Sequence, residues 1–203
     1  MEKYLNNIPR KEKIFIEIGS CDFDTLNHFA NEGWSGFIID PMKKYLNNIP
    51  RKEGVKYLPI AIDHVKGERI IHYAEDNIVD QDKDFAGMST FIPLNERNWG
   101  CRNVKGGKMD FLSGEMLIQT DTFRNIIRDY NIERIDFLKI DTEGYDFEIL
   151  KSFPWDNVLL RPKIIKVEHY HVVKGISEIT KYLEDRSYHV YTEVHDLYAI
   201  KLN

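Results

Sequence analysis

Short apolar runs alternate with amphipathic segments along most of this chain. Each run is too short for a helix, is rich in branched and aromatic residues, and ends near a glycine, an acid or a proline, which is typical of buried strands. Between the runs, apolar residues recur at intervals of three and four and predict helices that cover the strands. The predicted strands are 14–18, 36–40, 55–63, 135–140 and 163–168, and the predicted helices are 26–33, 45–49, 122–130, 147–153 and 176–185.

The alternation of strands and helices predicts an α/β, Rossmann-like fold with a mostly parallel sheet and helices on both faces. Two further apolar runs, 188–194 and 197–201, are separated only by His195 and Asp196. They predict a terminal hairpin, and therefore an antiparallel last strand. A run at 69–73 is typical of an edge strand.

Length and composition predict one domain. A chain of 203 residues can bury a substantial core, and we expect residues 14–203 to form it after an N-terminal arm at 1–13. The decapeptide KYLNNIPRKE occurs twice, at 3–12 and 44–53. A single short duplication does not predict a repeat architecture, and we assign the arm no chemistry.

Charge and cysteine content argue against several classes of protein. The formal net charge of -5 argues against nucleic-acid binding, which depends on basic patches. Cys21 and Cys101 are the cysteines, too few for a disulfide scaffold and without zinc-ligand spacing. No apolar run reaches the roughly 18 residues of a membrane span, and the amino terminus lacks the apolar core of a signal peptide. We expect a soluble, cytoplasmic protein.

The first two predicted strands end in residues that suit a nucleoside cofactor. Glu17 and Gly19 close the first strand and Asp40 closes the second, where an acid accepts hydrogen bonds from ribose hydroxyls. A dinucleotide would need further glycines beside its pyrophosphate, but Cys21 and Asp22 occupy this turn, which disfavours a nicotinamide-dependent dehydrogenase. S-adenosylmethionine carries a sulfonium cation and no phosphate, so it fits better. The alternative is that Gly19 only makes a tight turn and Asp40 only caps a helix.

The stretch 135–150, IDFLKIDTEGYDFEIL, places two acids at the end of a buried strand. Asp141 and Glu143 follow the apolar run, and Gly144 begins the turn into the next helix. Ligands bind at this position in open α/β sheets, and burying a carboxylate costs free energy unless a ligand, a metal or hydrogen bonds compensate. We interpret the stretch as a site. The alternative is a turn whose acids are satisfied locally, with Glu143 capping the helix. For Lys139 within the strand, the alternatives to a substrate contact are that its side chain snorkels or pairs with an acid.

The next predicted strand adds titratable groups at the same edge of the sheet. Glu168, His169 and His171 lie at its end. In one hypothesis Glu143, His169 or His171 is a general base that takes a proton from a hydroxyl, and Asp141 holds the amino group of the cofactor. In the other, Asp141, Glu168 and His169 bind a divalent cation such as Mg²⁺ or Mn²⁺, which polarises the hydroxyl.

Strand alternation limits which of these groups can meet. It places Glu168 and Tyr170 on one face and His169 and His171 on the other. At most one of these pairs therefore reaches a given site, unless the strand has already ended. A lone histidine near a strand end is also more often a satisfied polar residue than a catalyst.

Residues 74–113 show little periodicity, and long stretches of this kind inside a domain are usually lids or binding loops. We expect an insertion that binds the acceptor substrate. Trp99 can stack on the apolar face of a sugar, and Arg97 and Arg102 can hold a diphosphate or a carboxylate of the acceptor. The alternative is that the aromatic residues form a satellite core under a long loop.

Several motifs lie at the strand ends and helix starts, namely IEIGS at 16–20, IIDP at 38–41, LPIAID at 58–63, GMSTF at 87–91, TDTFRNII at 120–127, IDFLKIDTEGYDFEILKSF at 135–153 and KIIKVEHYH at 163–171. Together these motifs resemble the FkbM-type S-adenosylmethionine-dependent methyltransferases. The first turn departs from the family pattern, because it reads Gly-Ser-Cys-Asp-Phe at 19–23 where the family usually has Gly-Ala-Asn-x-Gly.

The resemblance implies a class I methyltransferase fold, with a seven-stranded, mostly parallel sheet and an antiparallel terminal strand. It also implies S-adenosylmethionine as the cofactor, a sugar or glycan hydroxyl as the methyl acceptor, and Ser89 as a further substrate-binding residue. The implied cofactor-binding residues are Glu17, Gly19, Ser20, Asp40, Pro41, Ala61, Ile62 and Asp141.

We therefore expect an O-methyltransferase that acts on a sugar or oligosaccharide. The alternatives are an O-methyltransferase of another small molecule or a nucleoside, and a catalytically silent cofactor-binding module of a larger glycan-synthesis protein. We expect no nucleic-acid partner and no membrane span. Both a homodimer and a place within a larger protein are compatible with the chain.

Overall fold

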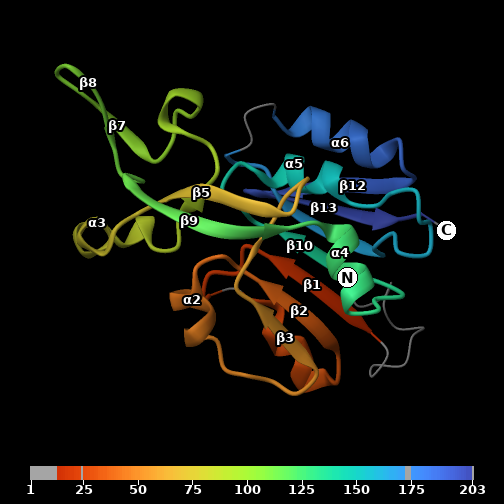
Figure 1. Ribbon diagram of the computed structural model, residues 1–203. Helices are drawn as coiled ribbons and strands as arrows, with labels where there is room; N and C mark the ends of the chain where they lie inside the picture. The colour runs from red at the N-terminus through yellow and green to blue at the C-terminus, as the bar shows by residue number, and fades with distance from the viewer. Residues whose placement is uncertain (1–12, 24, 172–174, 203) are drawn as a thin grey trace.

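A seven-stranded sheet forms the centre of the computed structural model, which describes residues 13–23, 25–171 and 175–202 (Figure 1). Its strands are β1 (Ile14–Ile18), β2 (Ser35–Ile39), β3 (Val55–Leu58), β10 (Phe137–Ile140), β11 (Ile164–Glu168), β12 (Tyr188–Glu193) and β13 (Asp196–Lys201). Their order is β12-β13-β11-β10-β1-β2-β3. The strands from β3 to β11 run parallel, and β13 is antiparallel to both of its neighbours.

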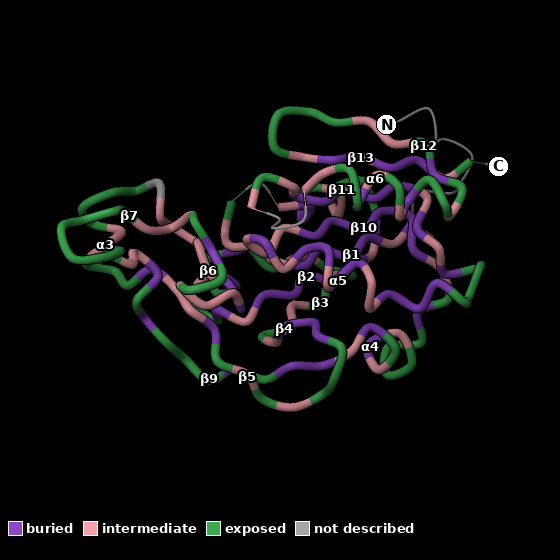
Figure 2. The backbone as a smooth tube through the Cα atoms, turned by 90° about the horizontal axis from the view of Figure 1, so that it is seen from above, coloured by how far each residue is buried: buried purple, intermediate pink, exposed green. Residues whose placement is uncertain are grey.

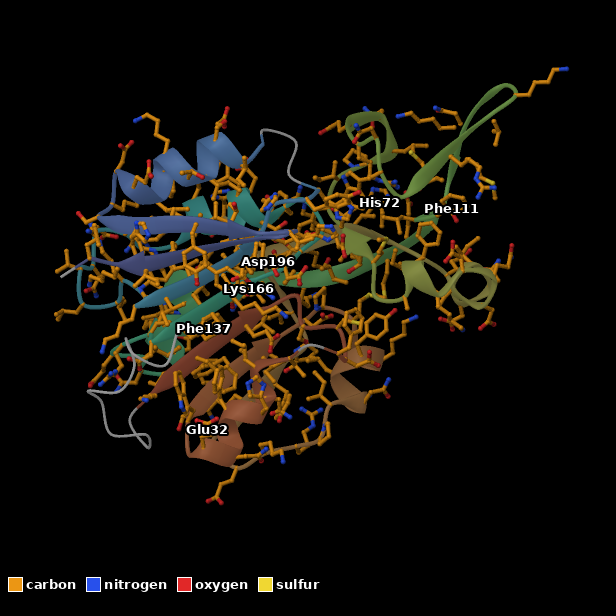
Figure 3. All side chains as sticks on the ribbon, turned by 180° about the vertical axis from the view of Figure 1, so that it is seen from behind. Glu32, His72, Phe111, Phe137, Lys166 and Asp196 are labelled. Atoms are coloured by element: carbon orange, nitrogen blue, oxygen red, sulfur yellow. The ribbon has the colours of Figure 1, made fainter. Side chains whose placement is uncertain are left out.

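The terminal hairpin completes this sheet as the sequence predicts. It inserts β13 between β11 and β12, so the last strand of the chain is the antiparallel one. The side chains of Lys166 on β11 and Asp196 on β13 form an ion pair across the antiparallel strands, with 3.0 Å between Nζ and Oδ2 (Figure 3). Tyr191 and Tyr198 stack on the same hairpin, with ring centroids 5.3 Å apart.

The helices are short, and two of them begin at a threonine cap. The Thr25 hydroxyl accepts a hydrogen bond from the Asn27 N–H, and the Thr122 hydroxyl accepts one from the Asn125 N–H, which satisfies N–H groups that a helix start leaves without partners. The first helix is a 3₁₀ helix. The helices around the central sheet are η2 (Leu26–Glu32), α2 (Lys43–Asn48), α4 (Phe123–Asp129), α5 (Asp146–Ser152) and α6 (Ile176–Glu184).

Alternate residues of the central strands face two hydrophobic cores, which Figure 2 shows as the buried middle of the molecule. Ile16 and Leu138 pack with α4, α5 and α6 on one face. Phe15 and Phe137 pack with η2 and α2 on the other. Each such side chain stabilises the fold by roughly 1.5–3 kcal/mol when fully buried. Helices on both faces are therefore confirmed.

A second sheet begins where the chain leaves β3. Its strands, in the order β4-β9-β5-β6, are β4 (Ala61–Ile62), β9 (Gly114–Asp121), β5 (Gly67–Tyr73) and β6 (Ser89–Thr90). The prediction of one strand over 55–63 is wrong, because Pro59 has no N–H to donate and the chain beyond it pairs with β9 instead. The run predicted as an edge strand lies between β9 and β6.

The sequence pattern does not predict β9. Its apolar residues Met116, Leu117 and Ile118 are consecutive, and Leu117 is 60 % exposed while Ile118 is buried. Three consecutive apolar residues, of which Met116 and Leu117 are both exposed, lack the alternation that identifies a half-buried strand. Residues 114–120 of β9 pair with β5, and this pairing stabilises the strand although its local sequence pattern does not predict one.

The insertion at 74–113 contains short elements of its own. They are α3 (Asp76–Gln81), η3 (Lys83–Phe85), η4 (Leu94–Glu96) and the hairpin of β7 (Cys101–Val104) and β8 (Gly107–Asp110). The hairpin projects from the body of the molecule (Figure 1). At its base Phe111 stacks on Phe85, with ring centroids 4.6 Å apart.

Two expectations from the sequence concern the duplicated decapeptide and membrane spans. Residues 1–12, which include the first decapeptide copy, lie outside the described ranges. The second copy, 44–53, forms most of α2 and the loop that leads to β3, where the fold needs a helix and a loop. Across the described ranges, the helices are all too short or too polar to cross a membrane.

Candidate active site

A cavity of about 830 Å³, which includes the space at its open mouth, lies at the carboxyl ends of β1, β2 and β10. Open α/β sheets bind ligands at this position. Ser89 from the insertion also lines it. Most of the residues expected to bind the cofactor are in its wall, namely Gly19, Ser20, Asp40, Pro41, Ala61, Ile62 and Asp141.

Gly19 lets the turn after β1 approach the end of β10. Its φ is +75°, and a Cβ atom at this position would lie 1.7 Å from the carbonyl oxygen of Asp141. Its N–H donates a hydrogen bond to the Ile39 carbonyl oxygen at 2.9 Å. Since no side chain fits here, the backbones of three strand ends meet and form the base of the cavity.

Asp40 presents a buried carboxylate to the cavity. Its Oδ2 accepts a hydrogen bond from the Cys21 N–H at 2.9 Å, and its Oδ1 accepts one from the Met42 N–H at 2.8 Å. Burial raises the pKa of Asp40 to about 6, although these backbone donors oppose the shift. Each carboxylate oxygen has a second lone pair, so Asp40 can hold the turn and still accept ribose hydroxyls.

Glu17 does not lie in the cavity wall, contrary to the expectation that it binds the cofactor. It is fully buried and accepts hydrogen bonds from the Thr25 hydroxyl and the Leu26 N–H, both at 2.8 Å. The Lys139 ammonium donates to it at 3.1 Å. Glu17 therefore joins η2 to the central sheet, and the alternative that Lys139 pairs with an acid is confirmed.

Asp146 holds the turn that follows β10. Its buried carboxylate accepts hydrogen bonds from the N–H groups of Thr142 at 2.8 Å and Gly144 at 2.9 Å. Glu143 has a φ of +54°, which is unusual for a residue other than glycine, and its carbonyl oxygen accepts the Thr90 hydroxyl at 2.7 Å. Asp146, rather than Glu143, thus satisfies this turn, and Glu143 lines the cavity.

Glu143, Glu168 and His171 meet at the edge of the cavity. His171 Nδ1 lies 2.6 Å from Glu143 Oε2 and 3.2 Å from Glu168 Oε1. β11 ends at Glu168, so the alternation that would separate Glu168 from His171 no longer applies beyond it. Burial lowers the pKa of His171, but the two carboxylates outweigh this effect and raise the pKa to about 9.

The metal-binding set predicted from the sequence is not the one that the fold assembles. Within the described ranges, the candidate ligand atoms that lie within 4.8 Å of one another belong to Glu143, Glu168 and His171. Asp141 lines the cavity instead, with its Oδ2 3.9 Å from Lys139 Nζ. Burial raises the pKa of Asp141 to about 7, against the attraction of Lys139. His169 lies outside the group.

Trp99 packs against the imidazole of this cluster. The rings of Trp99 and His171 stack with centroids 4.3 Å apart and planes inclined by 30°. The insertion therefore brings an aromatic ring to the group of acids.

The two arginines of the insertion are not placed to bind an acceptor at the cavity. The Arg97 side chain is 0 % exposed, pairs with Asp110 and donates to the Trp99 carbonyl oxygen at 2.9 Å. Arg102 lies on the exposed hairpin, over the ring of Phe111. Arg97 therefore fixes the base of the insertion beneath Trp99, and the substrate-binding interpretation of Arg97 is corrected to a structural one.

A further cluster at the cavity joins residues of three quoted motifs to Arg69, which lies outside them. The Tyr145 hydroxyl donates a hydrogen bond to Asp63 Oδ1 at 2.9 Å and accepts one from Arg69 at 2.7 Å. The Arg69 guanidinium lies over the ring of Phe91, 4.2 Å from its centroid, and Tyr145 and Phe91 line the cavity. Tyr145 and Asp63 stand in the quoted motifs, but Arg69 arrives from the second sheet.

Comparison with known proteins gives one family. A family model described as the methyltransferase FkbM domain matches residues 14–190. No curated protein matches the chain. A solved structure, the crystal structure of a fibrillarin/Nop5p complex, is similar with a TM-score of 0.43 and 9 % sequence identity, over 96 % of this chain and 75 % of that chain.

Proposed function

Because the chain belongs to the FkbM methyltransferase family, we propose that it transfers a methyl group from S-adenosylmethionine to a hydroxyl of a sugar or glycan. The observation that carries the proposal is one continuous site with two chemically different halves. One half is the cavity whose wall contains Asp40. The other is the cluster of carboxylates and imidazole to which Glu143 belongs. Glu143 belongs to both.

The residues of the cavity fit a nucleoside that carries a sulfonium cation. Asp40 accepts the ribose hydroxyls, and Ala61 and Ile62 give an apolar wall for the base. Asp141 also faces this space. When bound, the cofactor supplies an electrophilic methyl group.

Methyl transfer requires an acceptor oxygen in line with the methyl carbon and roughly 3 Å from it. The new C–O bond forms as the C–S bond breaks, and the hydroxyl proton passes to a carboxylate at the cavity, Asp141 or Glu143. General-base assistance of this kind is worth about 10²–10⁴-fold in rate. Each of these carboxylates lies in the cavity wall, so the proton need not leave the site.

A sugar ring suits the second half of the site. Its C–H face packs on an aromatic ring, while its hydroxyls need acceptors at the ring edge. Trp99 supplies the aromatic ring, and Glu143 and Glu168 supply carboxylates next to the His171 imidazole on which Trp99 stacks. One aromatic face beside several hydrogen-bond acceptors supports a methyl acceptor that carries many hydroxyl groups.

Calorimetric titration with S-adenosylhomocysteine tests the cofactor half of the proposal. Wild type should bind, Asp40→Ala should lose binding, and Asp76→Ala should bind like wild type, since Asp76 is an exposed carboxylate that pairs with Lys44 and is not in the cavity wall. Wild type that binds neither S-adenosylhomocysteine nor S-adenosylmethionine would overturn the proposal.

The acceptor half is tested with methyl-labelled S-adenosylmethionine against nucleotide sugars and oligosaccharides. We expect label in an acid-stable methyl ether, and Asp141→Asn should abolish it while leaving the fold intact. Label found only on nucleosides or other non-sugar small molecules would contradict the sugar acceptor but not methyl transfer. The silent-module alternative holds only if the cofactor binds and no acceptor class is methylated.

A further inference from the structure

Buried polar atoms without hydrogen-bond partners gather around the cluster at the edge of the cavity. Among the described residues they include Glu143 Oε2, Glu168 Oε2 and His171 Nδ1, with Thr142 Oγ1 and Trp99 Nε1 beside them. Buried polar atoms in native proteins are nearly always satisfied. Their concentration in one place therefore indicates a ligand that the polypeptide itself does not supply.

The His171 side chain is 9 % exposed and points between two carboxylates. Its Nδ1 is 2.6 Å from Glu143 Oε2, yet the two atoms do not meet the directional requirements of a hydrogen bond. Ligand atoms from Glu143, Glu168 and His171 all lie within 4.8 Å of one another. Three ligand atoms grouped this closely are typical of a coordination site.

We propose that Glu143, Glu168 and His171 bind a divalent first-row transition-metal ion such as Mn²⁺. Two carboxylate oxygens and one imidazole nitrogen form a mixed donor set. Imidazole suits transition ions, whereas sites made only of oxygen ligands suit Mg²⁺ and Ca²⁺. Three protein ligands also leave coordination positions open, as catalytic metal sites do.

The backbone is built to present these ligands. Glu143 has a positive φ, and its neighbour Gly144 packs against the carbonyl oxygen of His171 so closely that a Cβ atom would come within 2.8 Å of it. Strained backbone of this kind costs of order 1–3 kcal/mol and persists where the surrounding structure requires it. Here the strained turn places Glu143, which follows β10, beside His171, which follows β11.

The site deepens the proposed function and rests on it for its catalytic meaning. Glu143 lines the cavity, so an ion on this residue would border the acceptor. A hydroxyl that coordinates the ion becomes more acidic, and Asp141, which lines the cavity and is not one of the three ligands, then receives the proton.

Metal titration tests the site without any assay of activity. Metal-free protein is titrated with Mn²⁺, and free Mn²⁺ is followed by electron paramagnetic resonance, alongside calorimetry. Wild type should bind one ion, and Glu168→Gln and His171→Gln should each weaken binding by about tenfold or more. Glu115→Gln is the matched control, because Glu115 also lies beside a histidine, 3.5 Å from His72 Nδ1, but outside the group.

Binding of S-adenosylhomocysteine by the same variants shows that they fold and separates this proposal from the previous one. Wild type that binds S-adenosylhomocysteine but no Mn²⁺ overturns the metal site and leaves the proposed function standing. The metal site is overturned in the same way if both variants bind Mn²⁺ as tightly as wild type does. Mn²⁺ binding that Glu168→Gln and His171→Gln lose, in a protein that binds no S-adenosylhomocysteine, supports the site and contradicts the proposed function.

Discussion

The backbone of Gly144 lies so close to that of His171 that a Cβ atom at Gly144 would come within 2.8 Å of the His171 carbonyl oxygen. This contact joins the turn after β10 to the turn after β11. It places Glu143 against His171, although the two residues are far apart in sequence. The sequence around either residue does not predict that the other lies beside it. The site therefore depends on how closely two turns approach, and less on any single motif.

Gly144→Ala should cost more stability than an alanine at an otherwise similar glycine. Gly33 is the matched control, since its φ of +86° is close to the +89° of Gly144 but nothing lies within 4 Å of its Cβ position. Gly33→Ala should lose about 1–2 kcal/mol for the left-handed backbone. Gly144→Ala should lose roughly 3 kcal/mol or more, because the clash adds to the strain. Urea denaturation measures both, and equal losses would contradict the contact.

Cofactor affinity should fall as the pH is lowered through about 6, the raised pKa of Asp40, because protonation removes an acceptor for the ribose hydroxyls. The native carboxyl binds its proton more tightly than the unfolded one, whose ordinary pKa is 3.8. The contribution of Asp40 to stability is therefore lost as the pH rises from about 4 to about 6.

Calorimetry with S-adenosylhomocysteine between pH 5 and 8, in steps of about one unit of pH, checks whether cofactor affinity falls at low pH. Asp40→Asn should bind weakly and without this pH dependence. An unchanged pH dependence in Asp40→Asn would assign the effect to another group.

Trp99→Ala should raise the KM for the acceptor and leave the affinity for S-adenosylhomocysteine unchanged, since Trp99 packs on His171 and is not in the wall of the cavity. Loss of one aromatic contact of 0.5–1.5 kcal/mol corresponds to roughly two- to tenfold in KM. Trp99→Phe keeps an aromatic face and should recover most of the affinity. Steady-state kinetics with saturating cofactor measures this, and a KM that does not move removes Trp99 from the acceptor site.

Arg97→Met should destabilise the protein by about 3 kcal/mol, because it removes one partner of a buried ion pair. The Arg97 side chain is 0 % exposed against 18 % for its partner Asp110. Arg102→Met is the control, since Arg102 lies on the exposed hairpin, and it should change stability by about 0.5 kcal/mol or less. Thermal unfolding checks the difference. If both variants are equally stable, Arg97 does not support the base of the insertion.

The central sheet and the position of the cavity follow from the order of residues alone. Buried parallel strands need continuous apolar runs and end at turn residues, so the strands around Gly19, Asp40 and Asp141 are visible in the sequence. Their carboxyl ends lie at the same edge of the sheet, because the strands are neighbouring and parallel. The family motifs lie at these same strand ends for that reason.

Which polar groups share the site depends on the folded chain. Glu17 follows the same pattern as Asp40, but packing turns it away from the cavity onto Lys139 and η2. His171, rather than His169, reaches the acids because β11 ends at Glu168. Arg69 lies on β5, whose position depends on pairing with β9, a strand without a local signal. Side-chain direction and close backbone approach depend on contacts between distant segments, and these are fixed only when the chain is folded.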